Sequence, residues 1–392
     1  MIKKTVAINL CSASECTGCF SCEGVCPVQA ISHIVDTEDF HHPRIDENVC
    51  IGCHFCEKHC PVLNPVTKYE RGKAYASWSL SDDIRQSSSS GGIFSEIATY
   101  ILKEGGIVVG AELGKDGYVR HTVVREIKEL YRLRGSKYVQ SIVTTDLYKD
   151  IKEAINENKK VLFSGTPCQV AAIKSVFKNS PLLFTLDIIC HGVPSPELFK
   201  RVYDGIKEKY NGFEAFNFRM LKKWGEGLNI DKKTDNGIEN ISLSVEDSYY
   251  LDAFDKGLLN RDCCYSCKYA TIERVGDITV GDFWGIGDEN QFDYDIKKGC
   301  SIVLVNSDKG EQLVNNIKGN LFLEEREAEE TIRGGNEQLR HPLLRPKGRD
   351  TIYFDLASKN ITAVIKKYHL MLKKKSLISR AVGRVLRIIR KK

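Results

Sequence analysis

The chain has 392 residues, 42% of them hydrophobic, which is enough for two or three domains with cores of their own. Its formal charge of +5 is modest for this length and does not by itself indicate a nucleic-acid partner, so none is expected. The sequence shows no secretory leader, which argues against a secreted disulfide protein, and no apolar run of about 18 residues, which argues against a membrane span. Fifteen cysteines in such a chain indicate a reducing, cytoplasmic compartment.

An internal repeat lies near the N-terminus: CTGCFSCEGVCP begins at Cys16 and CIGCHFCEKHCP begins at Cys50. Both copies read C-x-x-C-x-x-C-x-x-x-C-P, the bacterial pattern for two 4Fe-4S clusters, in which the fourth cysteine of each run binds the other cluster. Zinc is the alternative metal, but two complete copies favour iron–sulfur clusters. We therefore predict two ligand sets, one of Cys16, Cys19, Cys22 and Cys60 and one of Cys50, Cys53, Cys56 and Cys26.

Residues 1–68 form this predicted ferredoxin module, in which HIVDTEDFHHPRIDENV indicates short strands and turns. The module is too small to bury much core and would depend on its metal. Cys11 lies outside the repeat and is expected to have no ligand role. LNPVTKYERGK reads as a linker to the rest of the chain.

From residue 72 the pattern is α/β, so the predicted fold class is α+β / α/β. SSSSGGIFSEIATYILKEG predicts a helix, GGIVVGAEL and YVRHTVV predict paired strands, and DITVGDFWG predicts a strand that ends in a glycine-rich loop. Three segments that contain VLFSGTPCQV, LLFTLDIICHGVPS and CSIVLVNSD predict strand, loop and helix units. We divide this core into an N-terminal part, 72–155, and a C-terminal part, 156–350, followed by a basic tail, 351–392.

Four cysteines of the core suggest a third metal site. Cys168 and Cys190 follow predicted strands, and such loops gather at one edge of an open α/β sheet. RDCCYSCKYA adds a C-C-x-x-C run, in which Cys264 has the better spacing to Cys267 than Cys263 has. Two strand-end thiols and this pair supply the four ligands that a 4Fe-4S cluster requires.

Other interpretations of these cysteines remain open. Zinc in a four-cysteine site has the same spacing. Cys168 at a helix N-terminus would also suit a nucleophile, with His191 as its base, although this leaves the other thiols unexplained. Packing is the better interpretation of Cys300, which precedes the apolar run SIVLV.

The two repeats together with SSSSGG, RGSKYVQS, SGTPCQVAAIK, CHGVPS and CYSCKYA…RVGDITVGDFWG resemble the beta subunit family of coenzyme F-420 hydrogenase and dehydrogenase. The resemblance extends over nearly all of residues 1–350. It implies a core that binds FAD and a 4Fe-4S cluster and passes hydride to or from a deazaflavin or a related acceptor. No G-x-G-x-x-G follows a strand, so a standard nicotinamide site is not indicated.

Two segments are candidates for contact with the flavin. A diphosphate prefers a helix start that small residues precede, which SSSSGG supplies, although a simple helix cap explains it equally well. GSKYVQS adds a hydroxyl, a cation for phosphate or reduced flavin, and an aromatic ring, although a solvated lysine is the simpler alternative. The candidates are Ser89, Ser90, Gly91, Gly92, Ser136, Lys137 and Tyr138.

Lys366 to Lys392 carry eleven Lys or Arg and no acid, and SLISRAVGRVLRIIRKK predicts a basic amphipathic helix. This helix fits an anionic membrane surface on the cytoplasmic side, an acidic partner subunit, or packing on its own domain. The whole chain predicts an iron–sulfur flavoprotein oxidoreductase that passes electrons between a hydride carrier or organic substrate, FAD and the clusters. The alternatives are a non-catalytic electron-transfer subunit that docks on a separate enzyme, and a thiol-dependent enzyme that uses Cys168.

Overall fold

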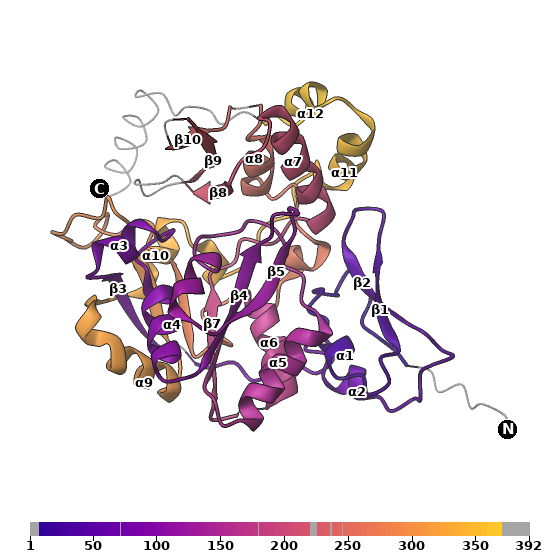
Figure 1. The fold of residues 1–392 in the computed structure, drawn as a ribbon, viewed down its shortest axis with the longest axis horizontal. Coiled ribbons are helices and arrows are strands. Elements are labelled where there is room, and N and C mark those ends of the chain that lie inside the picture. The colour runs from indigo at the N-terminus through magenta and orange to yellow at the C-terminus, as the bar shows by residue number, and fades with distance from the viewer. Residues whose placement is uncertain are drawn as a thin grey trace.

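A computed structural model describes residues 8–370, apart from residues 71, 179, 220–225, 236 and 245. Figure 1 shows three parts: an N-terminal module, a central sheet with helices on both sides, and a smaller unit of helices and strands beyond one end of the sheet. None of the described helices is long and apolar enough to cross a membrane.

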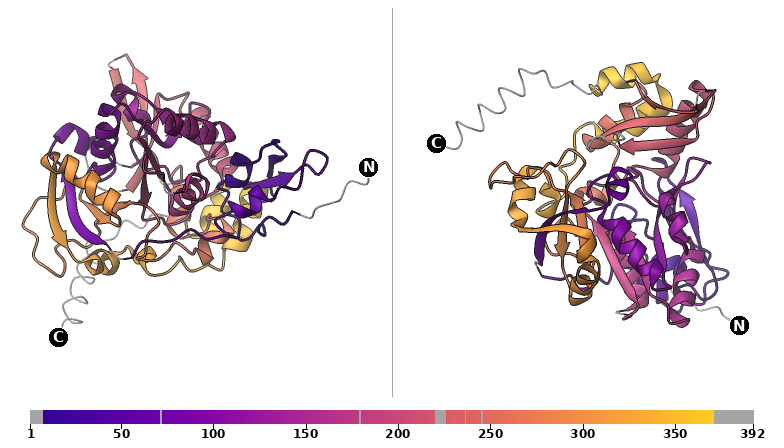
Figure 2. Two further views of the ribbon diagram at one scale, coloured as in Figure 1. Left: turned by 90° about the horizontal axis from the view of Figure 1, so that it is seen from below. Right: turned by 60° about the vertical axis from the view of Figure 1, so that its left-hand side comes forward.

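The short strands predicted for the N-terminal module form one antiparallel hairpin, and the module also has two one-turn helices that the sequence analysis did not predict. In the hairpin, Ile31 of β1 lies opposite Ile45 of β2. Helix α1 packs against helices α5 and α6 of the core, so the module lies beside the sheet (Figures 1 and 2). Its elements are α1 (Ser21–Gly24), β1 (Ile31–Val35), β2 (His41–Ile45) and α2 (Phe55–Lys58).

The central sheet has eight strands in the order β13-β3-β12-β11-β7-β6-β4-β5. The pairs β4–β6, β6–β7 and β7–β11 are parallel, and the other neighbouring pairs in this sheet are antiparallel. The predicted pairing of GGIVVGAEL with YVRHTVV is confirmed as β4 and β5. The strands are β3 (Lys73–Ser79), β4 (Ile107–Leu113), β5 (Val119–Val124), β6 (Val161–Gly165), β7 (Leu183–Ile188), β11 (Ile278–Asp282), β12 (Ser301–Val305) and β13 (Leu321–Arg326).

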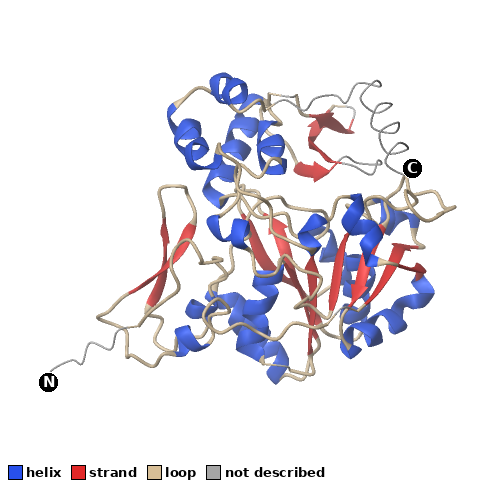
Figure 3. Ribbon diagram, turned by 180° about the vertical axis from the view of Figure 1, so that it is seen from behind, coloured by secondary structure: helices blue, strands red, loops and turns tan. Residues whose placement is uncertain are grey.

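Helices cover both faces of this sheet, as Figure 3 shows, and apolar side chains fill the space between them and the strands. One face packs against α4 and α9, whose apolar residues recur at helical spacing. The other packs against α5 and α6, and near β3 and β12 against α10. The helices of this part are α3 (Asp82–Gln86), α4 (Ile93–Lys103), η1 (Ile127–Arg132), α5 (Thr145–Asn156), α6 (Pro167–Phe177), η2 (Asp262–Ser266), α9 (Asp308–Ile317), η3 (Lys318–Asn320), α10 (Ala328–Gly334) and η4 (Glu337–Leu339).

The smaller unit is built around its own hydrophobic core. Helix α7, which the sequence predicts as part of a strand, loop and helix unit, packs here with β8 and α8, and Val119 of β5 joins the same core. The ferredoxin module contributes Phe40, which is 2% exposed, to this same core. Its elements are α7 (Pro196–Lys209), β8 (Ala215–Arg219), β9 (Glu226–Thr234), β10 (Gly237–Ser242), α8 (Tyr249–Asp255), α11 (Arg349–Ser358) and α12 (Ile361–Lys367).

The observed architecture refines the predicted organisation. Residues 72–155 and 156–350 contribute strands to one sheet, and residue 351 falls within α11. Helices α11 and α12 belong to the smaller unit, because Ile352 and Val364 are buried in its core. The predicted basic amphipathic helix lies in residues 371–392, outside the described residues.

Candidate functional site

The first predicted thiol set gathers in the module around α1 and the end of α2. Cys16 and Cys19 precede α1, Cys22 lies within it and Cys60 follows α2, and all four side chains are buried. Burial raises the pKa of the Cys22 thiol, and negative charge on Cys19, Cys16 and Cys60 raises it further. The four sulfurs therefore lie within electrostatic reach of one another, as the ligands of one cluster must.

The second predicted set lines a different hollow of the module. Cys26, Cys50, Cys53 and Cys56 share the wall of a cavity of about 20 Å³ with apolar side chains such as Ile31. The backbone N–H of Ala30 donates a hydrogen bond to Cys26 Sγ over 3.2 Å, which is the kind of donor that stabilises a cluster thiolate. Thus Cys26 joins the second repeat and Cys60 joins the first, the exchange that the repeat predicts.

Cys11 lies closer to the first set than its position outside the repeat suggests. Its sulfur is 4.0 Å from Cys60 Sγ. The hydrogen bond between the two thiols lowers the pKa of Cys60 to about 6. No sequence pattern indicates this contact, because Cys11 and Cys60 are brought together only by the fold of the module.

The third predicted set forms at the carboxyl edge of the central sheet. Cys168 lies in the first turn of α6, Cys190 follows β7, and Cys264 and Cys267 lie in and after η2. Burial raises the pKa of the Cys168 thiol, and negative charge on Cys190, Cys267 and Cys264 contributes in the same direction. Burial and the charge of Cys264 raise the pKa of Cys190 to about 12. We call Cys168, Cys190, Cys264 and Cys267 the core thiol set.

The remaining core cysteines take other positions. Cys263 lies next to this set and hydrogen bonds to Cys264. Cys300 is fully buried in the apolar cluster that covers β3 and β12, in agreement with a packing role. Within the described ranges, no three His, Cys, Asp or Glu side chains converge closely enough to hold a single metal ion.

Cys168 and His191 are not arranged as a nucleophile and its base. Cys168 Sγ lies 3.1 Å from Thr166 Oγ1, and no hydrogen bond joins it to His191 among the described residues. The ring nitrogens of His191 contact other groups, with Nε2 3.1 Å from the Asp255 carbonyl and Nδ1 3.4 Å from the Gln338 amide. These contacts favour a role of Cys168 within the core thiol set.

A cavity of about 310 Å³ opens at the carboxyl ends of β4, β6, β7 and β11, where open α/β sheets bind their ligands. Cys190 and His191 lie in its wall, so the cavity reaches the core thiol set. Six of the seven residues predicted to contact the flavin also line it: Ser89, Ser90, Gly92, Ser136, Lys137 and Tyr138.

Gly91, the seventh residue, is placed behind the cavity rather than in its wall. Its N–H donates to Ser301 Oγ over 2.9 Å. A Cβ atom at this position would lie 2.3 Å from the Ser77 carbonyl oxygen, so only glycine lets the loop approach β3 this closely. Gly91 therefore shapes the loop from behind the cavity wall.

The polar end of the cavity has features that suit a diphosphate. Helix α4 begins after Gly92, whose φ of 88° is left-handed, and no side chain caps the helix. Its first N–H groups are thus available to an anion, and Ile93 and Phe94 line the cavity. Arg134, which the sequence analysis did not select, lines the same end, and its Nε lies 3.2 Å from Ser95 Oγ. The donors present fit a doubly anionic group.

Lys137 is held in the cavity wall and is not a solvated surface lysine. Its ammonium donates to the backbone carbonyls of Arg132, Leu133 and Arg134 at 3.4, 3.0 and 2.7 Å. Burial lowers the pKa of Lys137 to about 7. A nearby anion would favour the charged form of this amine.

Two further cavity residues had no clear signal in the sequence. His121 on β5 bonds through Nδ1 to Ser141 Oγ at 2.8 Å and through Nε2 to the Ser164 carbonyl at 3.0 Å, and burial lowers its pKa to about 4. Gln169 also lines the cavity, and its side chain completes a capping box with Thr166. The T-x-x-Q spacing within GTPCQ is the one signal that would have indicated Gln169.

An arginine bonds to two residues of the cavity wall, Tyr138 and Asp282. Arg219 of β8 pairs with Asp282 at the end of β11, at 2.9 Å, and donates to the Tyr138 hydroxyl at 2.9 Å. Tyr138 stacks on Phe254 of α8 with ring centroids 5.1 Å apart. The smaller unit thereby contributes Phe254 to the cavity wall, and its Arg219 holds Tyr138 and Asp282 in place.

Family comparisons agree with this arrangement. Residues 74–147 match the N-terminal domain, and residues 158–331 the C-terminal domain, of the coenzyme F420 hydrogenase/dehydrogenase beta subunit. The chain belongs to this beta subunit family. Residues 15–64 match the 4Fe-4S dicluster domain, so this member carries a two-cluster ferredoxin module before its family core. The resemblance predicted from the sequence is confirmed.

No curated protein matches the chain. Among solved structures, it resembles a chain of the F420-reducing [NiFe] hydrogenase complex from Methanosarcina barkeri in a xenon-derivatised crystal. The two share 18% identity with a TM-score of 0.45, over 73% of this chain and 92% of the other.

Proposed function

We propose that this iron–sulfur redox subunit binds FAD in the 310 Å³ cavity, beside a third 4Fe-4S cluster held by the core thiol set. The observation that carries the proposal is the position of Cys190, which belongs to the core thiol set and also lines the cavity. When bound, a flavin exchanges two electrons with an organic partner and single electrons with iron–sulfur clusters.

The residues of the cavity divide into groups with different tasks. Arg134, Lys137 and the first N–H groups of α4 would hold the diphosphate, because they supply positive charge and hydrogen-bond donors at one end. Tyr138, fixed by its stacking on Phe254, would provide an aromatic side for a flat ring system. Helices α4 and α6 both begin at this edge of the sheet. The N-terminus of α4 would stabilise a bound anion, and the N-terminus of α6 would stabilise a thiolate at Cys168.

The organic partner is a hydride carrier or a reduced small molecule. The family description names coenzyme F420, so a deazaflavin is the first carrier to test. The N-terminal dicluster domain gives this chain a second route for single electrons, which fits a redox protein or partner subunit as the other participant.

Titration of the anaerobically prepared protein with FAD tests the proposal. We expect one FAD to bind per chain with quenching of its fluorescence, and at least tenfold weaker binding in Arg134→Ala. The matched control is Arg125→Ala, which removes an arginine whose partner is Asp150, outside the cavity. Absence of FAD binding in the wild-type chain would contradict the proposal and leave a non-catalytic electron-transfer subunit as the function.

A further inference from the structure

In the described residues, core side chains donate more hydrogen bonds to the first cysteine repeat than to the second, where Ser175 Oγ donates to the His59 carbonyl at 2.7 Å. Four consecutive backbone carbonyls of the first repeat each accept a hydrogen bond from a core side chain. Arg261 Nε donates to Cys16 O at 2.6 Å, Gln140 Nε2 donates to Thr17 O at 3.1 Å and to Gly18 O at 3.3 Å, and Tyr148 donates to Cys19 O at 3.1 Å. In the second repeat, Ile51 is 62% exposed and Cys53 is also exposed.

Arg261 is the centre of this contact. Its side chain is only 2% exposed, and it also donates to Gln140 Oε1 at 3.1 Å and to the His41 carbonyl at 3.0 Å. It lies three residues before Cys264 of the core thiol set. One side chain thus connects the first thiol set to the segment that carries the core thiol set.

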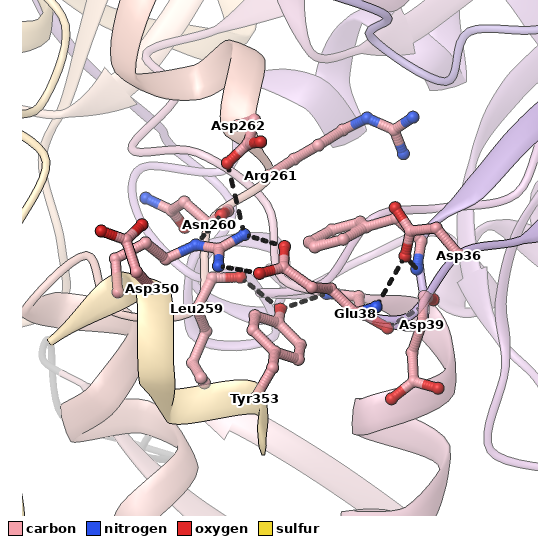
Figure 4. Close-up of polar contacts among 12 residues, drawn as sticks. Asp36, Glu38, Asp39, Leu259, Asn260, Arg261, Asp262, Asp350 and Tyr353 are labelled. Atoms are coloured by element: carbon pink, nitrogen blue, oxygen red, sulfur yellow. Dashed lines mark hydrogen bonds and ion pairs between the residues drawn. The ribbon is translucent and has the colours of Figure 1, made fainter. Parts of the chain in front are cut away.

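A second arginine attaches the hairpin of the module to the same segment (Figure 4). Arg349 of α11 is fully buried and binds both carboxylate oxygens of Glu38, at 2.7 and 2.6 Å. Its Nε donates to the Asn260 carbonyl at 2.8 Å, next to Arg261. Beside this ion pair, Phe40 of the hairpin packs against Tyr353 with ring centroids 5.6 Å apart.

Helix packing also brings the two thiol sets together. Helix α1, which carries Cys22, packs against α6, whose first turn carries Cys168. The first thiol set therefore lies on the side of the module that faces the core.

We infer that Arg261 and Arg349 are positioning residues that fix the ferredoxin module to the core, with its first thiol set toward the core thiol set and its second set outward. The module is in this view an immobile part of the subunit and not a carrier domain that swings on its linker. The inference rests on the proposed function only in that both thiol sets bind clusters.

Hydrogen exchange tests the contact itself. In the holoprotein, Glu38→Ala should increase the exchange rate of amides in the hairpin 31–45 by about tenfold, since it removes the partner of a buried arginine. Glu47→Ala, which removes an exposed carboxylate of the same module, is the matched control. Equal exchange in wild type and Glu38→Ala would overturn the role of Arg349.

Electron paramagnetic resonance of the reduced protein tests the position of the thiol sets. In the wild-type protein we expect a magnetic interaction between the cluster of the first set and the cluster of the core set. Arg261→Gln should abolish this interaction while the iron content stays unchanged. Arg261→Lys should restore it in part, because lysine keeps the charge and one hydrogen-bond donor. A wild-type interaction that persists unchanged in Arg261→Gln would overturn the inference. If iron analysis finds no core cluster, the proposed function fails, while the exchange experiment still decides whether the module is fixed.

Discussion

The backbone N–H of Ser136 donates a hydrogen bond to the Ser89 hydroxyl over 2.7 Å. This contact joins two segments, SSSSGG and GSKYVQS, that the sequence analysis selected separately and that lie 47 residues apart. Both then face the cavity whose wall includes Cys190. Several predictions about the cavity, the core thiol set and the fold can be tested from these relationships.

Cys168→Ser should remove the core cluster and leave the ferredoxin module intact. Loss of one of four thiolates should lower the iron content by about four atoms per chain. Iron analysis checks this, with Cys263→Ser and Cys300→Ser as matched controls that should retain full iron content. If Cys168→Ser abolished an activity while the iron content stayed unchanged, Cys168 would be a nucleophile and not a ligand.

The affinity for FAD should fall as the pH rises above about 7. Burial lowers the pKa of Lys137 to about 7, so its amine becomes neutral above this pH and no longer attracts the diphosphate. Because a bound anion would raise this pKa again, binding takes up a proton and weakens by up to about tenfold per pH unit. Fluorescence titrations at several pH values should show this slope in wild type and a flatter one in Lys137→Gln. A flat wild-type profile would exclude Lys137 as the cation of the site.

Gly91→Ala should destabilise the loop that shapes the cavity. The added Cβ would lie 2.3 Å from the Ser77 carbonyl, and relief of this clash should cost about 2 kcal/mol of unfolding free energy. Gly205→Ala is the control, because Gly205 is exposed in α7 with no atom within 4 Å of the new methyl, and alanine there should stabilise by up to about 1 kcal/mol. Urea unfolding of both variants measures the difference, and equal midpoints would contradict the prediction.

Removal of Arg274 should destabilise the central sheet without affecting FAD contacts. Arg274 is 2% exposed and pairs with the fully buried Asp187 at 2.8 Å, so Arg274→Met leaves an uncompensated buried carboxylate and should cost about 3 kcal/mol. The double variant Asp187→Leu with Arg274→Met should recover part of the loss, because both charges are then absent. Failure of the double variant to exceed the single one in urea unfolding would contradict this explanation.

The sequence was informative where chemistry depends on local spacing. The two repeats define the composition of both module thiol sets, and the loops after two strands locate Cys168 and Cys190 at one sheet edge. The sequence could not predict contacts that arise from packing of distant segments. Arg219 of β8 bonds to the cavity residues Tyr138 and Asp282 only because the smaller unit packs beside the sheet. Phe40 becomes a core residue only when the hairpin meets that unit. The sequence predicts Gly91 as a flavin contact, whereas in the structure it lies behind the cavity wall, because its contact with Ser77 depends on how closely the loop approaches β3.

Joint determination of metal and flavin content after anaerobic purification tests the central claim most directly. We predict about twelve iron atoms, in three 4Fe-4S clusters, together with one FAD per chain. About eight iron atoms with one zinc and no flavin would contradict the claim, because the core thiol set would then hold a structural metal and the cavity would have another occupant.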